Sequence, residues 1–291
     1  MCELLALSAS LPTQLTFSLH TLASHSGSGE GGSSRDGWGV AFYQGADVAL
    51  FREPQAADDS ALVRYLETQG PSTHLAISHI RHATRGAVQL SNTQPFVREL
   101  GGRSHVFAHN GDLPGVETNE RLALGAMRPI GQTDSEHAFC ALLARLHPLW
   151  RDMKVADAPP LAARMALVAT FAAELRALGP ANFLYADGDV LFAHSHRRKQ
   201  RGQAQPGPPG LWLLQRHCSG SDTAPDCDAH VAGIAVAAAT PPSPAAHIAL
   251  LLASVPLTDE AWRPLAEGEL VAVRDGELLA TDVAPLQQIA S

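Results

Sequence analysis

Segments of strand length lie at both ends of the chain and enclose a block of helical patterns, and this order constrains the fold most. Apolar runs, alternating or continuous, predict strands at residues 3–8, 39–43, 48–52, 74–80, 104–109, 182–186, 190–194, 211–215, 231–237, 248–255 and 270–274. Helical periodicity predicts helices at residues 59–68, 135–146 and 161–178, and a weaker one at 16–24. Asp187-Gly188 and Asp275-Gly276 predict tight hairpins. Without regular strand–helix alternation, we expect two mainly antiparallel sheets with outer helices, and not a doubly wound sheet.

Length and composition narrow the class of protein. The chain has 291 residues, of which 45% are hydrophobic, so it is long enough for a sizeable core and is globular in composition. No shift in composition marks a domain boundary, and we expect one domain. The four cysteines lie far apart, which does not indicate a disulfide scaffold in a chain of this length.

The charge of the chain argues against two classes of partner. Lys and Arg number 21 and Asp and Glu number 29, which gives a net charge of −8. A nucleic-acid or anionic-membrane surface requires a basic face. No run of apolar residues is long enough for a transmembrane helix, and Glu3 stands where a signal peptide carries positive charge. We therefore expect a cytoplasmic protein.

Cys2 is the most informative single residue. Free cysteine is often a small buried side chain, which is the ordinary interpretation at the start of a strand. Removal of the initiator Met1 would instead make Cys2 the terminal residue. Its α-amino group, with an ordinary pKa of about 7.7–8.0, would then lie beside the thiol and accept its proton. The position of Cys2 therefore also suits an N-terminal nucleophile that carries its own base.

Three later positions offer the groups that such a nucleophile requires. Arg81 follows an apolar strand, where a guanidinium forms either a surface ion pair or a bidentate fork for a carboxylate. Asn110 and Gly111 follow another strand as a turn signal, and the same pair offers two N–H donors for an oxyanion hole. Asp134 opens a helix, either as its N-cap or as a partner for a substrate ammonium.

Five short motifs carry a resemblance to a known family. They are Met1-Cys2-Glu3-Leu4-Leu5, Asp36-Gly37-Trp38-Gly39, Arg81-His82-Ala83-Thr84, His109-Asn110-Gly111 and Thr133-Asp134-Ser135-Glu136. In this order they resemble the class II glutamine amidotransferases of the N-terminal nucleophile hydrolase superfamily. The spacings of 29 residues from Arg81 to Asn110 and 24 from Asn110 to Asp134 are tolerated in that family. Val255-Pro256-Leu257-Thr258 with Trp262 further resembles the stand-alone, YafJ-like bacterial group.

The resemblance implies a fold and a role for each of these residues. The fold would be α+β, a four-layer αββα sandwich, with one class II glutamine amidotransferase domain at residues 2–280. Variable loops would lie at 195–210 and 219–228, and a C-terminal tail at 281–291. Cys2 would attack the side-chain amide of glutamine or of a γ-glutamyl compound, with its freed α-amine as base.

In the same comparison, Asn110 and Gly111 would form the oxyanion hole. Arg81 and Thr84 would hold the α-carboxylate of glutamine, and Asp134 its α-ammonium. The reaction would pass through a γ-glutamyl thioester and release ammonia or an amine and then glutamate. Neither a cofactor nor a metal is implied, and the fourteen histidines show no zinc-site spacing.

Two departures from the family pattern concern the substrate. His82 stands where glucosamine-synthase-like members carry an aromatic residue, so the cover over bound glutamine is expected to differ. No synthase domain is recognised, so residues 27–34 and 195–210 are interpreted as a substrate lid and a variable insert. The basic tract at residues 194–201 is interpreted as a solvated loop, with contact to an anionic partner as the alternative.

Other functions stay open beside glutamine hydrolysis. The substrate could be a γ-glutamyl amide or peptide, as in ergothioneine-pathway relatives. The chain could also be a glutaminase subunit that works only with a separate synthetase partner. A non-catalytic binding protein is disfavoured, because every proposed catalytic residue is present. In each case we expect a small-molecule ligand and neither nucleic acid nor membrane as a partner.

Overall fold

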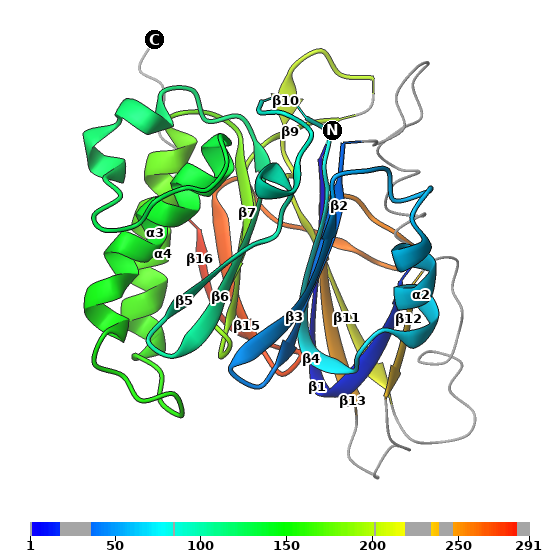
Figure 1. Ribbon diagram of the computed structural model, residues 1–291. Coiled ribbons are helices and arrows are strands. Elements are labelled where there is room, and N and C mark those ends of the chain that lie inside the picture. Colours follow the sequence, from blue (N-terminus) through cyan, green and yellow to red (C-terminus); the bar gives the residue numbers. More distant parts are fainter. Residues whose placement is uncertain are drawn as a thin grey trace.

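Two large antiparallel sheets face each other, with helices on their outer faces (Figure 1). The computed structural model describes residues 2–17, 36–83, 85–200, 202–218, 234–238 and 247–283. Every strand pairing within these ranges is antiparallel. The predicted α+β sandwich of two mainly antiparallel sheets is therefore confirmed.

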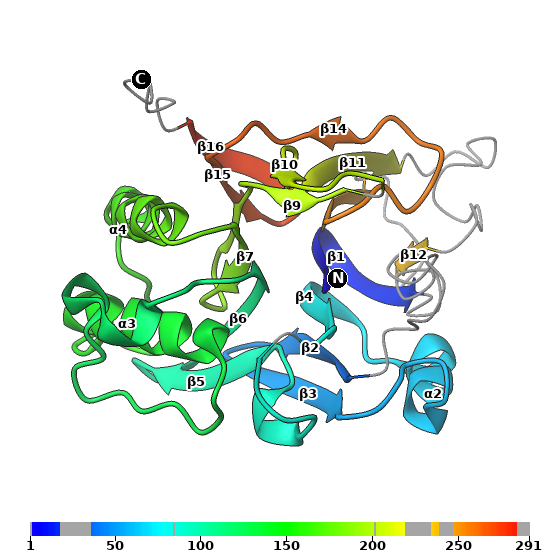
Figure 2. The ribbon, with the colours of Figure 1, turned by 90° about the horizontal axis from the view of Figure 1, so that it is seen from above.

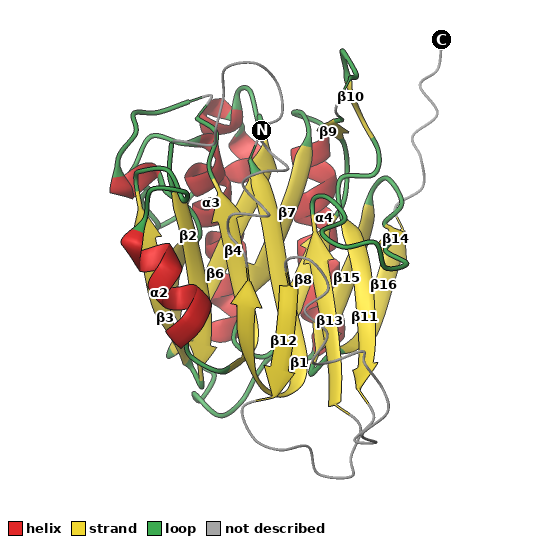
Figure 3. Cartoon of the chain, turned by 90° about the vertical axis from the view of Figure 1, so that its right-hand side faces the viewer, coloured by secondary structure: helices red, strands yellow, loops and turns green. Residues whose placement is uncertain are grey.

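The first sheet has eight strands in the order β14-β11-β13-β1-β4-β2-β3, with β12 paired to the far part of β1 (Figure 3). Its strands are β1 (Glu3–Phe17), β2 (Trp38–Gln44), β3 (Asp47–Glu53), β4 (Thr73–Ile80), β11 (Trp212–Cys218), β12 (Ile234–Ala238), β13 (His247–Ala253) and β14 (Arg263–Pro264). Strand β1 lies near the middle, so both of its neighbours hold the segment that follows Cys2.

The second sheet has six strands in the order β16-β15-β8-β7-β6-β5. Its strands are β5 (Phe96–Leu100), β6 (Arg103–Gly111), β7 (Ala181–Ala186), β8 (Leu191–His194), β15 (Glu269–Arg274) and β16 (Glu277–Val283). A separate short hairpin is formed by β9 (Arg198–Lys199) and β10 (Pro206–Gly207). Figure 2 looks onto the end of the sandwich at which β1 begins, with β6 and β7 on the facing sheet.

Helices cover the outer face of each sheet. The α-helices are α2 (Ala61–Gln69), α3 (Asp134–Trp150) and α4 (Leu161–Arg176), and single turns of 3-10 helix occur at Leu90–Asn92, Val116–Thr118 and Glu120–Leu122. Helices α3 and α4 pack on the six-stranded sheet around Phe107, which stacks on Phe139. On the eight-stranded sheet, α2 buries Val63 and Leu66. None of the described helices is long and apolar enough to cross a membrane.

Apolar side chains fill the space between the sheets and both outer interfaces. In β1, Leu4 and Ala6 point toward the other sheet, whereas Leu5 and Leu7 join the core under α2. Side chains alternate along a strand, so a strand buried on both faces reads as a continuous apolar run. This explains why residues 4–7 are all apolar, although the strand belongs to an antiparallel sheet.

The structure corrects some of the local predictions. The weak helix at 16–24 is wrong at its start, because Thr16 and Phe17 pair with β12 as part of β1. The rest of that segment, like 27–34 and 219–228, lies outside the described residues. Strand β5 was not predicted, since Arg98 and Glu99 interrupt its apolar pattern. Strand β16 runs to Val283, past the predicted start of the tail at residue 281.

The interpretation of the basic tract 194–201 as a solvated loop is also wrong for much of its length. His194, Ser195, His196 and Arg198 are all buried. Each of the four bonds through a main-chain or side-chain group to a strand or to the residue before one, because the tract crosses the end of the sandwich between β8 and β11. Buried polar groups require such partners, so a polar sequence does not by itself imply exposure.

His194 is a buried histidine whose bonds define a neutral ring. Its Nδ1–H donates to the carbonyl oxygen of Ala181 at 2.7 Å, and its Nε2 accepts from Arg176 Nη1 at 2.8 Å. A proton on Nε2 would face the guanidinium in a dry environment. Burial, together with the charge of Arg176, lowers the pKa of His194 to about 3.

We expect acid to destabilise the fold in part through His194. Below the ordinary pKa of histidine, about 6.5, His194 is protonated in the unfolded chain but stays neutral in the folded chain. Protonation therefore stabilises the unfolded state, and the folded state loses stability as the pH falls through about 6.5. Between pH 7 and pH 5 the ring should remove about 2 kcal/mol from the free energy of unfolding. Denaturant titrations of wild type and His194→Gln at both pH values test this, because the variant should lose that much less. An equal loss in both proteins would contradict it.

Candidate active site

The thiol of Cys2 is held by the main chain of a single residue. Antiparallel pairing of β1 with β4 places Glu3 opposite Ile80, so Cys2 lies beside the residues that follow β4. The Cys2 Sγ–H donates to the carbonyl oxygen of His82 at 3.3 Å, and the His82 N–H donates to Sγ at 3.2 Å. Backbone groups make both contacts, so they do not require a particular side chain at position 82.

The environment of Cys2 favours the protonated thiol. Burial raises the pKa of the Cys2 thiol above its ordinary value, and the neighbouring carboxylate of Glu3 acts in the same direction. The N–H of His82 and the charge of Arg81 oppose this shift in pKa without cancelling it. The thiolate is the nucleophilic form of cysteine, so a base close to Sγ is needed to produce it at neutral pH.

Asn110 and Gly111 end strand β6 directly beside Cys2. The Nδ2 of Asn110 donates to the carbonyl oxygen of Cys2, which fixes the amide next to the nucleophile. An amide nitrogen carries two hydrogens, so one such bond leaves a second donor. Gly111 has φ +155°, and a Cβ there would lie 1.8 Å from the carbonyl oxygen of Pro180. Only glycine fits here, because the main chain at residue 111 lies so close to that of Pro180.

Gln94, which no motif in the sequence marks, holds the residue before Asn110 through two hydrogen bonds. Its Oε1 accepts from the N–H of His109 at 2.6 Å, and its Nε2 donates to the carbonyl oxygen of the same residue at 3.2 Å. The pairing of β5 with β6 ends at Phe96 and Phe107. Beyond that point the Gln94 side chain bonds to the main chain of β6 in the way that a paired strand would. The sequence offers one weak indication of its role: Gln94 directly precedes Pro95 and the apolar Phe96 that begins β5.

Arg81 is buried, and its terminal nitrogens are occupied by backbone carbonyl oxygens. Nη1 donates to Asp36 at 3.3 Å and to Ala87 at 3.1 Å. Nη2 donates to Arg85 at 2.9 Å and to Gly86 at 3.1 Å. The guanidinium lies close enough to Cys2 to affect the pKa of the thiol, but in this state its fork holds the loop at residues 85–87.

Asp134 is buried at the start of α3 and connects that helix to the turn after Gly111. Its Oδ2 accepts from the N–H of Leu113 at 2.8 Å, and its Oδ1 accepts from the N–H of Ser135 at 2.8 Å. The N-cap of α3 is Thr133 and not Asp134, since the Thr133 hydroxyl accepts from the N–H of Glu136. Thr84 lies outside the described residues.

Two buried histidines near the site are poor candidates for a base. His79, in β4, has its pKa lowered to about 3 by burial and by the neighbouring His109 and Arg81. Burial likewise lowers the pKa of His109, whose Nδ1 is 2.9 Å from the Ser135 hydroxyl in α3. Among the residues that the structure describes, no group of three or more His, Cys, Asp or Glu is placed to hold a metal ion.

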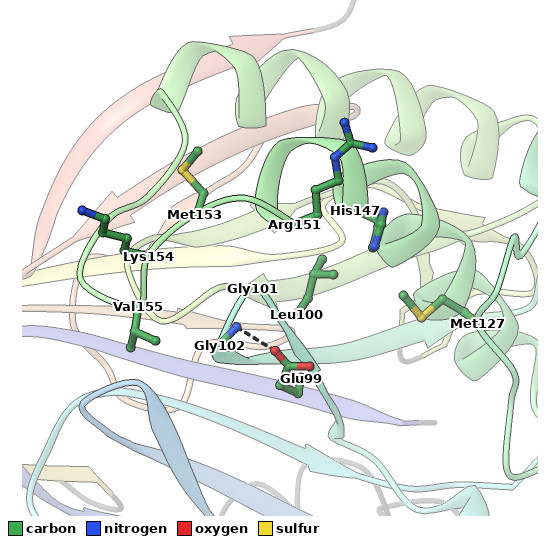
Figure 4. Close-up of a pocket in the computed structure, with 10 residues that line it drawn as sticks. All are labelled: Glu99, Leu100, Gly101, Gly102, Met127, His147, Arg151, Met153, Lys154 and Val155. Carbon is green, nitrogen blue, oxygen red and sulfur yellow. Dashed lines mark hydrogen bonds between the residues drawn. The ribbon is translucent and has the colours of Figure 1, made fainter.

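A hollow of about 520 Å³ lies elsewhere, on the helical side of the molecule (Figure 4). It is bounded by the β5–β6 turn at residues 99–102, by Met127, and by the end of α3 with the segment that follows it, including His147 and Arg151. None of the predicted site residues lines it. The candidate active site is therefore defined by the contacts of Cys2 and not by this hollow.

Comparison with known proteins identifies the family of the chain. The family of glutamine amidotransferases class-II matches residues 1–290. The chain is 35% identical over 271 residues to YafJ of Escherichia coli K12, provisionally named a glutamine amidotransferase, and 92% of this chain and 96% of YafJ are covered.

Solved structures show the same fold. A predicted glutamine amidotransferase from Pseudomonas aeruginosa PA01 matches with a TM-score of 0.65 and 34% identity, over 96% of this chain and 100% of that one. The glutamine phosphoribosylpyrophosphate amidotransferase of B. subtilis is 14% identical and shares the fold with a TM-score of 0.60, over 98% of this chain and 50% of that one. The chain therefore belongs to the class II glutamine amidotransferases, and is an enzyme with the sandwich fold of N-terminal nucleophile hydrolases.

Proposed function

We propose that the enzyme hydrolyses the side-chain amide of glutamine or of a γ-glutamyl compound. The sulfur of Cys2 attacks the amide carbon, the C–N bond breaks, and ammonia or an amine leaves with one added proton. Water then cleaves the γ-glutamyl thioester, which yields glutamate and restores the thiol. One observation carries this proposal: the side-chain amide of Asn110 is hydrogen-bonded to the carbonyl oxygen of Cys2, whose thiol contacts the main chain of His82.

The base in this proposal is the α-amine of Cys2 after removal of Met1. A thiol whose pKa is raised by burial needs a proton acceptor within reach. His79 and His109 are unsuited to that role, because burial lowers the pKa of each ring. The freed α-amine belongs to the same residue as the thiol and has an ordinary pKa close to neutrality. It takes the thiol proton during attack and returns it to the leaving nitrogen.

The developing oxyanion would be stabilised by Asn110 and Gly111. Negative charge appears on the carbonyl oxygen as the sulfur attacks, and fixed N–H donors stabilise it best when they need no rearrangement. The side chain of Asn110 is fixed by its hydrogen bond to the carbonyl oxygen of Cys2. The main chain just before Asn110 and Gly111 is fixed by the two hydrogen bonds between the Gln94 side chain and His109. These contacts favour an oxyanion hole that exists before substrate binds.

The far end of glutamine would be held by Arg81, Thr84 and Asp134. In the free enzyme the terminal nitrogens of Arg81 bond to neutral carbonyl oxygens, including those of residues 85–87. A carboxylate forms stronger, charge-assisted bonds to a guanidinium. Binding of the α-carboxylate would thus displace part of that loop from Arg81, while the carboxylate of Asp134 receives the α-ammonium.

Replacing the nucleophile gives the most direct test of the reaction. We expect Cys2→Ala to release no glutamate from a panel containing glutamine and γ-glutamyl amides and peptides. Cys140→Ala is the matched control, because Cys140 is a buried free cysteine in α3. It should retain turnover.

Mass spectrometry of the active protein should also show the loss of Met1. Turnover by Cys2→Ala, or full activity of protein that keeps Met1, would contradict the mechanism. Activity of wild type that appears only after a separate synthetase is added would favour the glutaminase-subunit alternative.

Removing the proposed oxyanion donor should slow the chemical step. We expect Asn110→Ala and the isosteric Asn110→Asp to lower kcat by about 10² to 10³, which corresponds to about 2.7–4 kcal/mol. Steady-state kinetics with the best substrate of the panel measure this. Wild-type kcat in Asn110→Asp would exclude the side-chain amide from the oxyanion hole.

The role of Arg81 can be separated from that of its loop. We expect Arg81→Ala to raise KM for glutamine by about tenfold or more, since a charged hydrogen bond contributes roughly 1.5–3 kcal/mol. Arg85→Ala is the control, because Arg85 lies in the same loop but pairs with Asp112 and Glu117 on the surface. Its KM should stay close to wild type. An unchanged KM in Arg81→Ala would refute the carboxylate contact.

A further inference from the structure

Residues 195–198 cross from one sheet to the other at the end of the sandwich that carries Cys2. Ser195 extends the second sheet, because its N–H donates to the carbonyl oxygen of Glu269 at 2.9 Å. Its hydroxyl accepts from the N–H groups of Gly210 and Leu211, both at 3.1 Å, just before β11 of the first sheet. We use the name bracket for residues 195–198 together with the side chain of Asn182.

One side of the bracket is bonded to the strand of the proposed oxyanion hole. Asn182 in β7 pairs directly with Asn110 in β6. Its Nδ2 donates to the carbonyl oxygens of Asn110 at 3.2 Å and of Arg197 at 2.7 Å, and its Oδ1 accepts from the N–H of His196 at 2.7 Å. Asn182 is fully buried, and its bonds to Asn110 and His196 are shielded from water.

The other side of the bracket is bonded to the residue that follows the nucleophile. Arg198 Nη2 donates to Glu3 Oε1 at 2.8 Å, and the two side chains are only 3% and 1% exposed. Arg198 also donates to the carbonyl oxygen of Ser254, and the Ser254 hydroxyl donates to Glu3. The same hydroxyl accepts from the N–H of Leu4 at 3.0 Å.

These contacts close a circuit around the candidate active site. The circuit runs from the Cys2 carbonyl to the Asn110 side chain, from the Asn110 carbonyl through Asn182 to residues 196–198, and from Arg198 through Glu3 back to Cys2. Between the facing surfaces of the two sheets lies the apolar cluster around Leu4, Ala108 and Leu184, and a further hydrogen bond between the sheets, from the Tyr43 hydroxyl to the carbonyl oxygen of Ala186, lies at the opposite end of β7. Apolar contacts are not directional, whereas hydrogen bonds are, so the circuit restricts the relative position of β1 and β6 more sharply.

We propose that Asn182 and Arg198 are positioning residues, which set the distance and orientation between the Cys2 sulfur and the Asn110–Gly111 donors through the bracket. This inference rests on the proposed function, because it assigns the two residues to that same reaction. Neither side chain touches the substrate. Small displacements of a nucleophile from its donors are costly in rate, by up to about 10² for roughly 1 Å. Loosening the bracket therefore lowers kcat while substrate binding at Arg81 continues.

The test uses two variants of the full chain. Asn182→Ala removes the bonds to Asn110, Arg197 and His196. The double variant Glu3→Gln/Arg198→Met removes the ion pair without leaving a buried unpaired charge, a replacement that often preserves stability. The matched control is Arg164→Met/Asp187→Asn, since that ion pair is 2.8 Å long, is equally buried, and lies at the opposite end of β7.

We expect both bracket variants to lower kcat by about tenfold to a hundredfold and to change KM by less than about threefold. Amide hydrogen exchange of the peptide at residues 2–8 should be faster in both, because the double variant loses the direct contact to Glu3 and Asn182→Ala frees residues 196 and 197, which precede the Arg198 that holds Glu3. The control should leave kcat and this exchange unchanged, even where its melting temperature falls.

Two outcomes would overturn the proposal. One is a kcat within twofold of wild type in both bracket variants together with unchanged exchange at residues 2–8. The other is an equal loss of kcat in the control, which would indicate a general effect of lower stability. The exchange measurement needs no substrate. A wild type that hydrolyses no γ-glutamyl compound, with faster exchange in the bracket variants alone, would refute the proposed function and leave the bracket standing as a structural device.

Discussion

The antiparallel pairing of β1 with β4 is the constraint on which the site depends. It places Cys2 against the main chain of His82, whose N–H and carbonyl oxygen both contact the sulfur. These two backbone contacts orient the thiol. The carbonyl of Cys2 in turn receives the Asn110 amide from the facing sheet, so the proposed nucleophile and oxyanion donor are joined across the sandwich.

Polar and apolar interactions have separate tasks in this fold. The body of the sandwich is held by three apolar clusters, one between the sheets and one under each helical layer. Directional bonds lie at both ends of the sandwich, and at the end where β1 begins they involve Gln94, Asn182 and Arg198. Burial supplies most of the stability of a domain, whereas hydrogen bonds specify geometry. Apolar packing between the sheets thus supports the site, and the hydrogen bonds of Gln94, Asn182 and Arg198 orient the strands that form it.

Much of the fold was predictable, because buried strands and helices leave periodic apolar patterns. The strands around Cys2 and Asn110 and all three described α-helices were found this way. Strand β5 was missed, since Arg98 and Glu99 break its pattern, and Thr16 was misassigned because pairing with β12 outweighs a local helical preference. The burial of Arg198 was also missed, since a charged side chain gives no sign in the sequence of the carboxylate it will meet across the fold.

The sequence by itself determined the chemical groups and their order: a cysteine at position 2, a guanidinium, an Asn-Gly pair and an acidic helix start, each beside a strand or helix with a recognisable pattern. The tertiary structure alone decided the contacts among them. It joined Asn110 to Cys2, directed Arg81 toward its own loop, and gave Asn182 its partners. These contacts link residues 4 to 108 positions apart in the chain, and a hydrogen bond depends on distance and direction in space, which local pattern does not encode.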